Sequence, residues 1–368
     1  MRILVLGGYG NFGARISRAL ARDAGYEVIA AGRDPEHGAE RATLVARVAR
    51  ARLDLAAPGF ARELARLGPG LVVHCAGPFQ GQDYRVARAA IAAGAHYVDL
   101  ADGRAFVTRF AEHLGGAARA AGVLALSGAS SVPALSSAVV DALAERFSAV
   151  RSIEVAIAPG QRAPRGAAAI AAVLGYAGRP FDWWRNGAWT TVHGWQGLRR
   201  LHFAGLGSRW AAACDIPDLE LFPVHYPGVL TVEFRAALEL PAQQLALWLA
   251  AALRRAGVPL PLERWAAPLD RLAGWMDRLG TERGGMLVRL EGIRKSGARG
   301  RVEWHLMAGA NHGPEVPCMA AILLARKLAR GAIAARGAYP CLGFLALDEF
   351  TPELQRWGIT TMIGEYAS

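Results

Sequence analysis

Short runs of strand-forming residues alternate with helix-like segments in the first third of the chain. The runs of strand length are Arg2–Leu6, Tyr26–Ala31, Arg50–Leu55, Leu71–Ala76, His96–Leu100 and Val123–Ser127. Helix-like segments separate them, among them Gln82–Ala93 and Gly103–Ala121. Strands that alternate with helices form parallel sheets, because each crossover returns the chain to the same edge. The pattern therefore predicts an α/β fold with a doubly wound parallel sheet.

The first strand leads directly into a glycine-rich turn and a helix. Gly8, Gly10 and Gly13 match G-x-G-x-x-G between a strand and a helix, the context that gives this pattern its meaning. Such glycines allow a tight turn, a close approach to a pyrophosphate and close helix packing, and the helix N-terminus attracts phosphates. We expect a dinucleotide to contact Gly8, Tyr9, Gly10, Asn11, Phe12 and Gly13. A glycine-rich turn that binds nothing is the alternative.

The end of the second strand bears on the identity of the dinucleotide. An NAD site usually has an acid there that binds the ribose hydroxyls, but this strand ends in Ala31-Gly32 and the next charged residue is Arg33. A guanidinium at this point favours NADP(H), because it pairs with a 2′-phosphate. Asp34 would favour NAD if it turned inward. Asp54, at the end of the third strand, is expected near the adenine or as a surface acid.

Ligands of doubly wound sheets bind beyond the carboxyl ends of the strands, and this rule selects three more loops. The end of the fourth strand and the loop after it add the cofactor-binding candidates Cys75, Ala76, Gly77, Pro78 and Phe79. The fifth strand and the loops after the fifth and sixth strands supply candidates for substrate contact and proton transfer, namely Tyr97, Asp99, Asp102, Ser130 and Ser131. A carboxylate there can titrate near neutrality when it is desolvated. The alternatives are that Asp99 caps a helix, that Tyr97 belongs to the core and that the serines are helix caps.

The second half of the chain has a different pattern. Strand-like stretches at Arg151–Ala158, Val229–Phe234, Met286–Leu290 and Val302–Met307 predict a mixed sheet whose outer face could support a homodimer. All ten tryptophans follow residue 182, and the segment from Trp183 to Trp210 reads as loop-like. Its tryptophans, with Trp183 and Trp184 as substrate candidates, either line an apolar cavity or interface or belong to the core.

Composition narrows the class of protein. The 368 residues carry a net charge of +11, but nearly all of the basic charge is dispersed arginine, which disfavours nucleic acid as a partner. No apolar run reaches the ~18 residues of a membrane span, and the first strand begins too early for a signal peptide. The four cysteines are widely spaced, which argues against metal and disulfides and favours the cytoplasm.

Several motifs resemble the saccharopine dehydrogenase (saccharopine reductase)-like NADP oxidoreductases. They are GGYGNFG, AGR, VVHCAGPF, AAGAHYVDLAD and SGASSVPALS, followed near the end by GPEVPCMAAILLARKL and GAYPCLGFLALDEF. The resemblance implies a Rossmann-type dinucleotide-binding domain of residues 1–130 plus about 315–368. It also implies an inserted α/β substrate and dimerisation domain of residues 131–314. Asn311 and His312 lie in a loop that matches the family's later motif. The resemblance implies that Asn311 contacts the substrate and that His312 relays a proton; the alternative is an ordinary loop.

The reaction that the resemblance implies is NADPH-dependent hydride transfer to an imine or an activated C=C or C=O bond. The small-molecule substrate is expected to be bulkier and less polar than saccharopine, since the tryptophan-rich insert diverges most from the family. The alternative is a nucleotide-binding scaffold or redox sensor on the same fold that performs no turnover. No sequence motif supports metal hydrolysis or serine acyl transfer.

Overall fold

The computed structural model describes residues 1–36, 47–164 and 167–367, which form two compact units. Unit 1 comprises residues 1–135 and 314–345, and unit 2 comprises residues 136–313 and 346–368. The expected boundaries placed the whole C-terminal segment in the dinucleotide-binding domain. The division differs there, because the last strand, β16 (Thr360–Ala367), pairs with a strand of unit 2.

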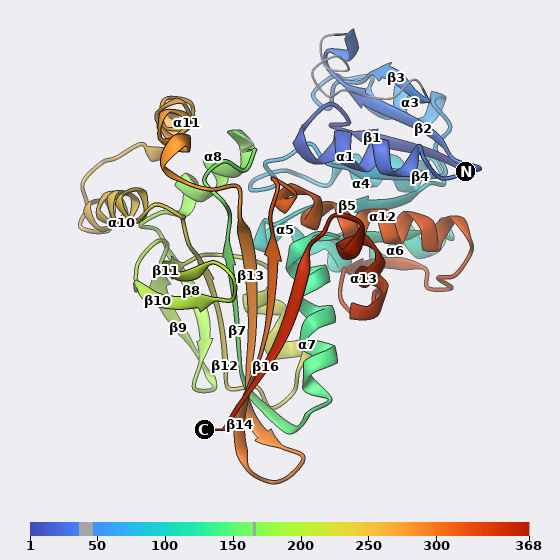
Figure 1. Ribbon diagram of the computed structural model, residues 1–368. Coiled ribbons are helices and arrows are strands. Elements are labelled where there is room, and N and C mark those ends of the chain that lie inside the picture. The colour runs from blue at the N-terminus through green and yellow to red at the C-terminus, as the bar shows by residue number, and fades with distance from the viewer. Residues whose placement is uncertain (37–46, 165–166, 368) are drawn as a thin grey trace. The chain divides into compact units, whose positions relative to one another are not determined.

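Unit 1 is built on a seven-stranded sheet whose described strand pairs are all parallel, in the order β15-β6-β5-β4-β1-β2-β3 (Figure 1). The strands are β1 (Arg2–Leu6), β2 (Glu27–Gly32), β3 (Val48–Arg52), β4 (Leu71–His74), β5 (His96–Asp99), β6 (Leu124–Ser127) and β15 (Gly337–Pro340). The helices are α1 (Asn11–Leu20), α3 (Phe60–Arg66), α4 (Arg85–Ala92), α5 (Arg104–Thr108), α6 (Phe110–Ala120) and α12 (Val316–Ala329). Short turns η1 (Ser131–Leu135) and η4 (Gly313–Glu315) lie at the limits of unit 1. The order 3-2-1-4-5-6 is that of a Rossmann-type sheet, which confirms the predicted fold class.

The central strands of this sheet are buried on both faces, as the continuous apolar runs predict, whereas the edge strand β3 is largely exposed. Ile3, Leu4 and Val5 have no exposed surface, because helices cover a parallel sheet on each side. The single helix predicted over Gly103–Ala121 is instead two, α5 and α6, which meet at Arg109.

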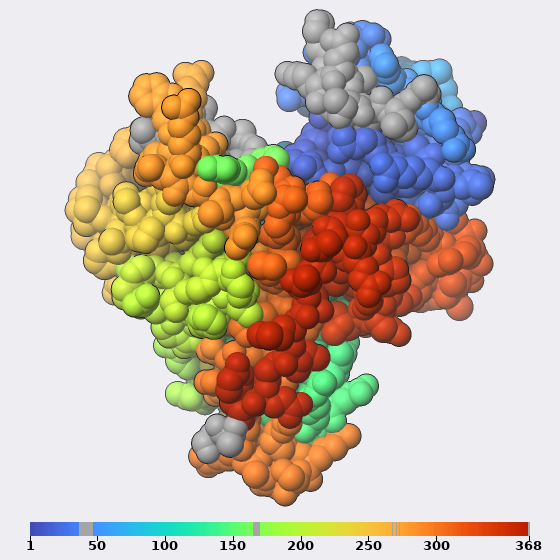
Figure 2. All heavy atoms as spheres, viewed as in Figure 1, coloured from blue at the N-terminus to red at the C-terminus, as the bar shows by residue number. Residues whose placement is uncertain are grey.

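Unit 2 is built on a nine-stranded mixed sheet in which β12 and β7 are parallel and the other described pairs are antiparallel (Figure 1). Besides β16, its strands are β7 (Phe147–Ala158), β8 (Pro180–Arg185), β9 (Ala188–His193), β10 (Arg199–Phe203), β11 (Gly207–Ala213), β12 (Thr231–Ala236), β13 (Gly284–Arg294) and β14 (Arg299–Ala308). Its helices are α7 (Ser136–Ala144), α8 (Ala167–Tyr176), α9 (Asp218–His225), α10 (Pro241–Arg255), α11 (Ala266–Trp275) and α13 (Leu347–Arg356), with short turns η2 (Leu262–Trp265) and η3 (Met276–Leu279). Figure 2 shows the C-terminal residues, coloured dark red, at the surface of this unit.

The segment from Trp183 to Trp210 is not a loop, as the sequence suggested, but two β-hairpins. Strands β8 and β9 meet at Asn186 and Gly187, which both have positive φ, 52° and 77°. An Asn-Gly pair between two strand-like stretches is the strongest short-range hairpin signal, because both residues tolerate the left-handed region. The hairpin was not predicted because polar residues interrupt the strand-like pattern on both sides of Asn186 and Gly187.

Candidate functional site

The turn after β1 requires glycine at several positions. Gly7 has φ of +73°. A Cβ on Gly8 would lie 2.7 Å from the Cβ of Ala30, and one on Gly13 would lie 2.2 Å from the carbonyl oxygen of Gly7. Any larger residue would therefore push helix α1 away from the sheet.

The N-terminus of α1 fits a phosphate group. Gly10 is the N-cap and makes no side-chain cap hydrogen bond, so the helix dipole and the first-turn N–H groups point toward the turn. Arg15 donates a hydrogen bond to the carbonyl oxygen of Asn11 at 2.7 Å and another to its side-chain oxygen. The side chain of Phe12 is half-buried, and its carbonyl oxygen lies 3.6 Å from the Sγ of Cys318.

Tyr9 occupies the position where an NAD site holds its acid. Its hydroxyl donates to the carbonyl oxygen of Ala30 at 2.8 Å, and burial raises its pKa. A Cβ on Gly32, the last residue of β2, would lie 2.8 Å from the Cδ2 of Tyr9. The tyrosine ring therefore excludes a carboxylate side chain at the end of β2.

Arg33 and Asp54 follow the ends of the neighbouring strands β2 and β3, and both side chains are exposed. The Asp54 carboxylate accepts a hydrogen bond from the N–H of Ala56 at 3.0 Å, which forms a local turn. Asp34 is also exposed. The structure thus brings these side chains to the carboxyl edge of the sheet that also carries the glycine turn.

The loop after β4 lies directly against the glycine turn. A Cβ on Gly7 would lie 3.0 Å from the backbone of both Cys75 and Ala76, and the Cys75 N–H donates to the carbonyl oxygen of Leu6 at 2.8 Å. The loop continues through a cis peptide bond between Gly77 and Pro78.

Gln82 holds this loop in place. Its side-chain N–H groups donate to the carbonyl oxygens of Ala76 at 2.9 Å and Pro78 at 2.7 Å. Sequence reasoning missed Gln82, because no pattern predicts which side chain will satisfy loop carbonyls. The side chain of Phe79, a predicted cofactor contact, is buried: only 4% of its surface is exposed, and its ring packs edge-on against His74 at 5.0 Å.

A buried polar chain runs across the ends of β4, β5 and β6. Nδ1 of His74 lies 3.0 Å from the hydroxyl of Tyr97, and burial lowers the pKa of His74 to about 4. The Asp99 carboxylate accepts hydrogen bonds from the N–H of Gly128 at 2.8 Å and from the Ser127 hydroxyl at 3.0 Å. Burial nevertheless raises the pKa of Asp99 to about 6 and raises that of Tyr97. At neutral pH, His74 and Tyr97 are therefore uncharged.

The burial of this chain corrects two of the predicted roles. The side chains of Tyr97 and Asp99 have no exposed surface, so neither reaches a substrate directly. Asp99 instead fixes the loops after β5 and β6. Asp102, by contrast, is exposed, and its carboxylate accepts a hydrogen bond from Gln80 at 3.2 Å.

Ser130 and Ser131 follow β6 and are half-buried. The carbonyl oxygen of Ser130 accepts from the N–H of Leu135 at 3.2 Å, which closes the turn η1, and the Val132–Pro133 peptide bond is cis. Both serines therefore lie at the same edge of the sheet as the glycine turn.

The remaining candidates belong to unit 2. Trp183 is 1% exposed and stacks against the guanidinium groups of Arg185 and Arg235 at 5.2 and 5.0 Å. It is therefore a core residue, as the alternative interpretation held, and does not line an open cavity. Trp184 is half-buried and donates from Nε1 to the carbonyl oxygen of Val229 at 2.9 Å.

Asn311 and His312 lie in the loop after β14. Asn311 has φ of +57°, and its side chain donates to Glu282 at 3.4 Å. Nδ1 of His312 lies 2.7 Å from the carbonyl oxygen of Trp357, so this nitrogen carries the proton and donates it. The ring of His312 packs edge-on against Trp357 at 5.0 Å.

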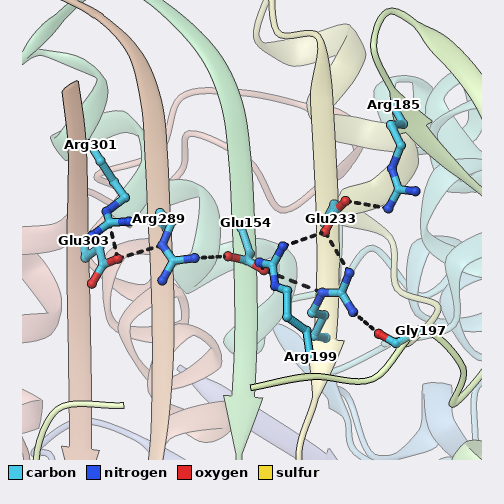
Figure 3. A network of polar contacts seen from close by, with 9 residues as sticks. Glu154, Arg185, Gly197, Arg199, Glu233, Arg289, Arg301 and Glu303 are labelled. Atoms are coloured by element: carbon cyan, nitrogen blue, oxygen red, sulfur yellow. Dashed lines mark hydrogen bonds and ion pairs between the residues drawn. The ribbon is translucent and has the colours of Figure 1, made fainter. Parts of the chain in front are cut away.

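Unit 2 also holds a ladder of charges that sequence reasoning missed (Figure 3). Glu233, Glu154, Arg289 and Glu303 lie side by side in register on β12, β7, β13 and β14. Arg289 bridges Glu154 at 2.6 Å and Glu303 at 2.7 Å. Further contacts come from Arg185, Arg199, Arg235, Arg301 and His305. The side chains of Glu154, Arg235 and Glu303 are each 6% exposed, so the centre of the cluster is buried. We call these nine residues the charge ladder.

The described residues contain neither a metal-binding cluster nor a membrane-spanning helix. No group of three or more His, Cys, Asp or Glu side chains among them could hold a metal ion. Within the same part of the chain, no helix has the length and apolar character needed to cross a bilayer. The four cysteines are free thiols.

Comparison with known proteins bears on the edge of the sheet in unit 1. Residues 3–126 match the family model described as saccharopine dehydrogenase NADP binding domain. No curated protein matches the chain. Among solved structures, apo saccharopine dehydrogenase (L-Glu forming) from Saccharomyces cerevisiae has a TM-score of 0.67 and 13% identity, over 100% of both chains. A homospermidine synthase from Legionella pneumophila in complex with NAD has a TM-score of 0.63 and 10% identity, over 100% of this chain and 91% of that one. These identities establish a shared fold and no more.

Proposed function

Residues 3–126 match the family model of the saccharopine dehydrogenase NADP binding domain, and from this premise we propose that the protein is an NADPH-dependent oxidoreductase. The carrying observation is the agreement between this match and the glycine turn, where Gly8 and Gly13 cannot bear a side chain. The predicted cofactor, NADP(H), is the nucleotide for which this domain family is described.

The proposed reaction is reduction of an imine or an activated C=C or C=O bond in a small or medium-sized molecule. Bound NADPH supplies the hydride from its nicotinamide ring. The glycine turn and the N-terminus of α1 bind the pyrophosphate, and Arg33 binds the 2′-phosphate. The loop that Gln82 holds against Gly7 orients the cofactor at the ends of β1 and β4.

Asp102 is the residue to which we assign proton transfer in unit 1. Its carboxyl group is exposed in the loop after β5. The next residue, Gly103, packs closely against the loop after β4, because a Cβ on Gly103 would lie 3.3 Å from the backbone carbonyl carbon of Phe79. The buried Asp99 carboxylate holds the loops after β5 and β6 through hydrogen bonds from the N–H groups of Ala101 and Gly128, and Tyr97 contacts His74 at the end of β4. Ser130 and Ser131 contribute polar contacts to the substrate from the end of β6.

We also propose a homodimer in the cytoplasm that acts on a partly apolar substrate. The four free thiols are consistent with a reducing compartment. Trp184 and the half-exposed Trp189, whose rings pack edge-on at 5.1 Å, supply apolar surface in unit 2. Light scattering of the purified chain tests the dimer: a mass of one chain would contradict it.

Turnover separates this proposal from a scaffold or redox sensor. We expect the wild-type protein to oxidise NADPH with at least one acceptor in a panel of imines, enones and ketones, followed by absorbance at 340 nm. Asp102→Asn should lower kcat by about 10²–10⁴-fold and leave NADPH affinity unchanged. Tight NADPH binding without oxidation by any acceptor would favour the scaffold.

A further inference from the structure

The ends of β2 and β3 bring a second arginine to the cofactor edge. In the parallel pairing of these strands, Arg52 is the register partner of Gly32, and Arg50 is the partner of Ala30. Neighbouring strands lie about 4.8 Å apart. Arg52 therefore ends β3 directly beside Gly32, the residue that precedes Arg33.

The same pairing fixes the face of the sheet from which Arg52 projects. A Cβ on Gly8 would meet Ala30, and a Cβ on Gly32 would meet the ring of Tyr9, so Ala30 and Gly32 face the glycine turn. Register partners in a parallel pair present their side chains on one face, and residues two apart share that face. Arg50 and Arg52 therefore lie on the face that carries Tyr9 and the glycine turn.

The charges at this corner are unevenly paired. Arg50 lies 3.7 Å from Glu36, and Asp34 and Asp54 are the other acids nearby. Arg33 and Arg52 are both exposed, and neither makes an ion pair with any residue that the structure describes. Two exposed guanidinium groups at adjacent strand ends form a pair suited to a dianion.

We propose that Arg52 is a second ligand of the 2′-phosphate of NADP(H), opposite Arg33 across the ends of β2 and β3. This inference rests on the proposed function, since it assigns a ligand within the same cofactor site. The ring of Tyr9 fills the space above Gly32, and the phosphate is bound beside it by side chains from both strands. Arg52 thereby sets the preference for NADPH over NADH.

Calorimetric titration of the full chain with NADPH, NADH and adenosine 2′,5′-bisphosphate tests this assignment. Arg52→Gln should weaken NADPH and the bisphosphate by about 10- to 100-fold and leave NADH within about twofold. Arg52→Lys keeps the positive charge but loses the bidentate guanidinium, so its NADPH affinity should lie between that of the wild type and that of Arg52→Gln. The control is Arg22→Gln, an exposed arginine beyond the other end of α1, about 15 Å along the helix, which should change none of the three affinities.

The outcomes separate this inference from the function on which it rests. If Arg33→Ala lowers the NADPH preference and Arg52→Gln and Arg52→Lys do not, Arg33 alone binds the phosphate and the inference is wrong. If Arg52→Gln weakens NADH as much as NADPH, Arg52 does not contact the 2′-phosphate. If the wild-type chain binds neither dinucleotide, the proposed function itself fails. A thermal unfolding midpoint equal to that of the wild type establishes that the fold of each variant is intact.

Discussion

The seven-stranded and nine-stranded sheets both bury ionisable side chains, and they neutralise them in different ways. In the seven-stranded sheet, His74, Tyr97 and Asp99 lie at strand ends without a countercharge, and burial shifts their pKa values toward the neutral forms. In the nine-stranded sheet, the charge ladder pairs each carboxylate with arginines, and the hydrogen bonds and charges of His305, Arg289 and Arg301 lower the pKa of Glu303 to about 2 despite its burial.

The difference separates strand ends whose buried side chains hold loops from a sheet face whose charges join strands. Asp99 accepts hydrogen bonds from the loops after β5 and β6, with the uncharged His74 and Tyr97 near it, whereas a ladder of opposite charges holds the strands of the other sheet together. Glu233 and Glu154 are direct cross-strand neighbours, an arrangement that is destabilising unless cations lie between them. Arg235 contacts both glutamates, at 3.0 and 3.6 Å, and so supplies that cation.

Removal of a carboxylate from the ladder should have the largest effect on stability. Glu154→Ala removes the shared carboxylate of the buried Arg235 and Arg289 and of the half-exposed Arg199, so we expect the free energy of unfolding to fall by about 3–5 kcal/mol in urea denaturation. NADPH affinity of the folded variant should not change. Glu291→Ala, an exposed site on β13, is the matched control and should stay within about 0.5 kcal/mol. A loss from Glu154→Ala below about 1 kcal/mol would mean that the ladder does not stabilise the sheet.

A methyl group in the glycine turn should act on binding instead. Gly13→Ala places its Cβ 2.2 Å from the Gly7 carbonyl oxygen, so the helix N-terminus must shift. We expect NADPH affinity to fall at least about 100-fold, or about 2.7 kcal/mol, by calorimetry. Gly116→Ala in α6 meets no atom within 4 Å and should raise stability by about 0.5–1 kcal/mol without changing affinity. Equal affinities for the two variants would remove the glycine turn from the site.

The pH dependence of stability should have opposite signs in the two sheets. The pKa of Asp99 is raised to about 6, so between about pH 4 and 6 the folded state retains a proton that the unfolded state releases, and stability falls as pH rises. The lowered pKa of Glu303 contributes stability above about pH 4.5 that is lost as pH falls toward 2.

Unfolding of Asp99→Asn and Glu303→Gln from pH 3 to 7 measures both contributions. Relative to wild type, Asp99→Asn should gain about 2–3 kcal/mol between pH 4 and 7, and Glu303→Gln should lose most at pH 7. Parallel pH profiles for the two variants would contradict the distinction between the sheets.

The parallel sheet and its glycine turn were predictable because their signals are local. Apolar runs such as Leu71–Ala76 and glycines at fixed spacing follow directly from burial and from close backbone approach. The same logic predicted that Arg33, Asp102 and the loop at Gly77 follow the carboxyl ends of strands, where the structure has them. It failed for side-chain direction, since strand periodicity alone cannot say whether Tyr97 and Asp99 face solvent or the core.

Long-range pairing was beyond the sequence for a different reason. The charge ladder joins Arg289 and Glu303, on neighbouring strands of one hairpin, to Glu154, which is 135 residues from Arg289 in the chain and meets it only through sheet register. The predicted boundary placed residues 346–368 in the dinucleotide-binding domain, because the sequence does not show that Thr360–Ala367 forms a strand that pairs with β14. The roles of Gln82 and Arg52 could not be predicted either, because they depend on the loop carbonyls that Gln82 contacts and on the strand register that places Arg52 beside Gly32.

The most direct test of the central claim is calorimetric titration of the wild type and Arg33→Ala with NADPH and NADH. The carboxyl edge of the seven-stranded sheet should bind NADPH more tightly than NADH, and the variant should lose roughly 1.5–3 kcal/mol of NADPH binding with NADH unchanged. Equal affinity for both dinucleotides, unaltered in the variant, would contradict an NADP site at Arg33 and point to NAD through Asp34.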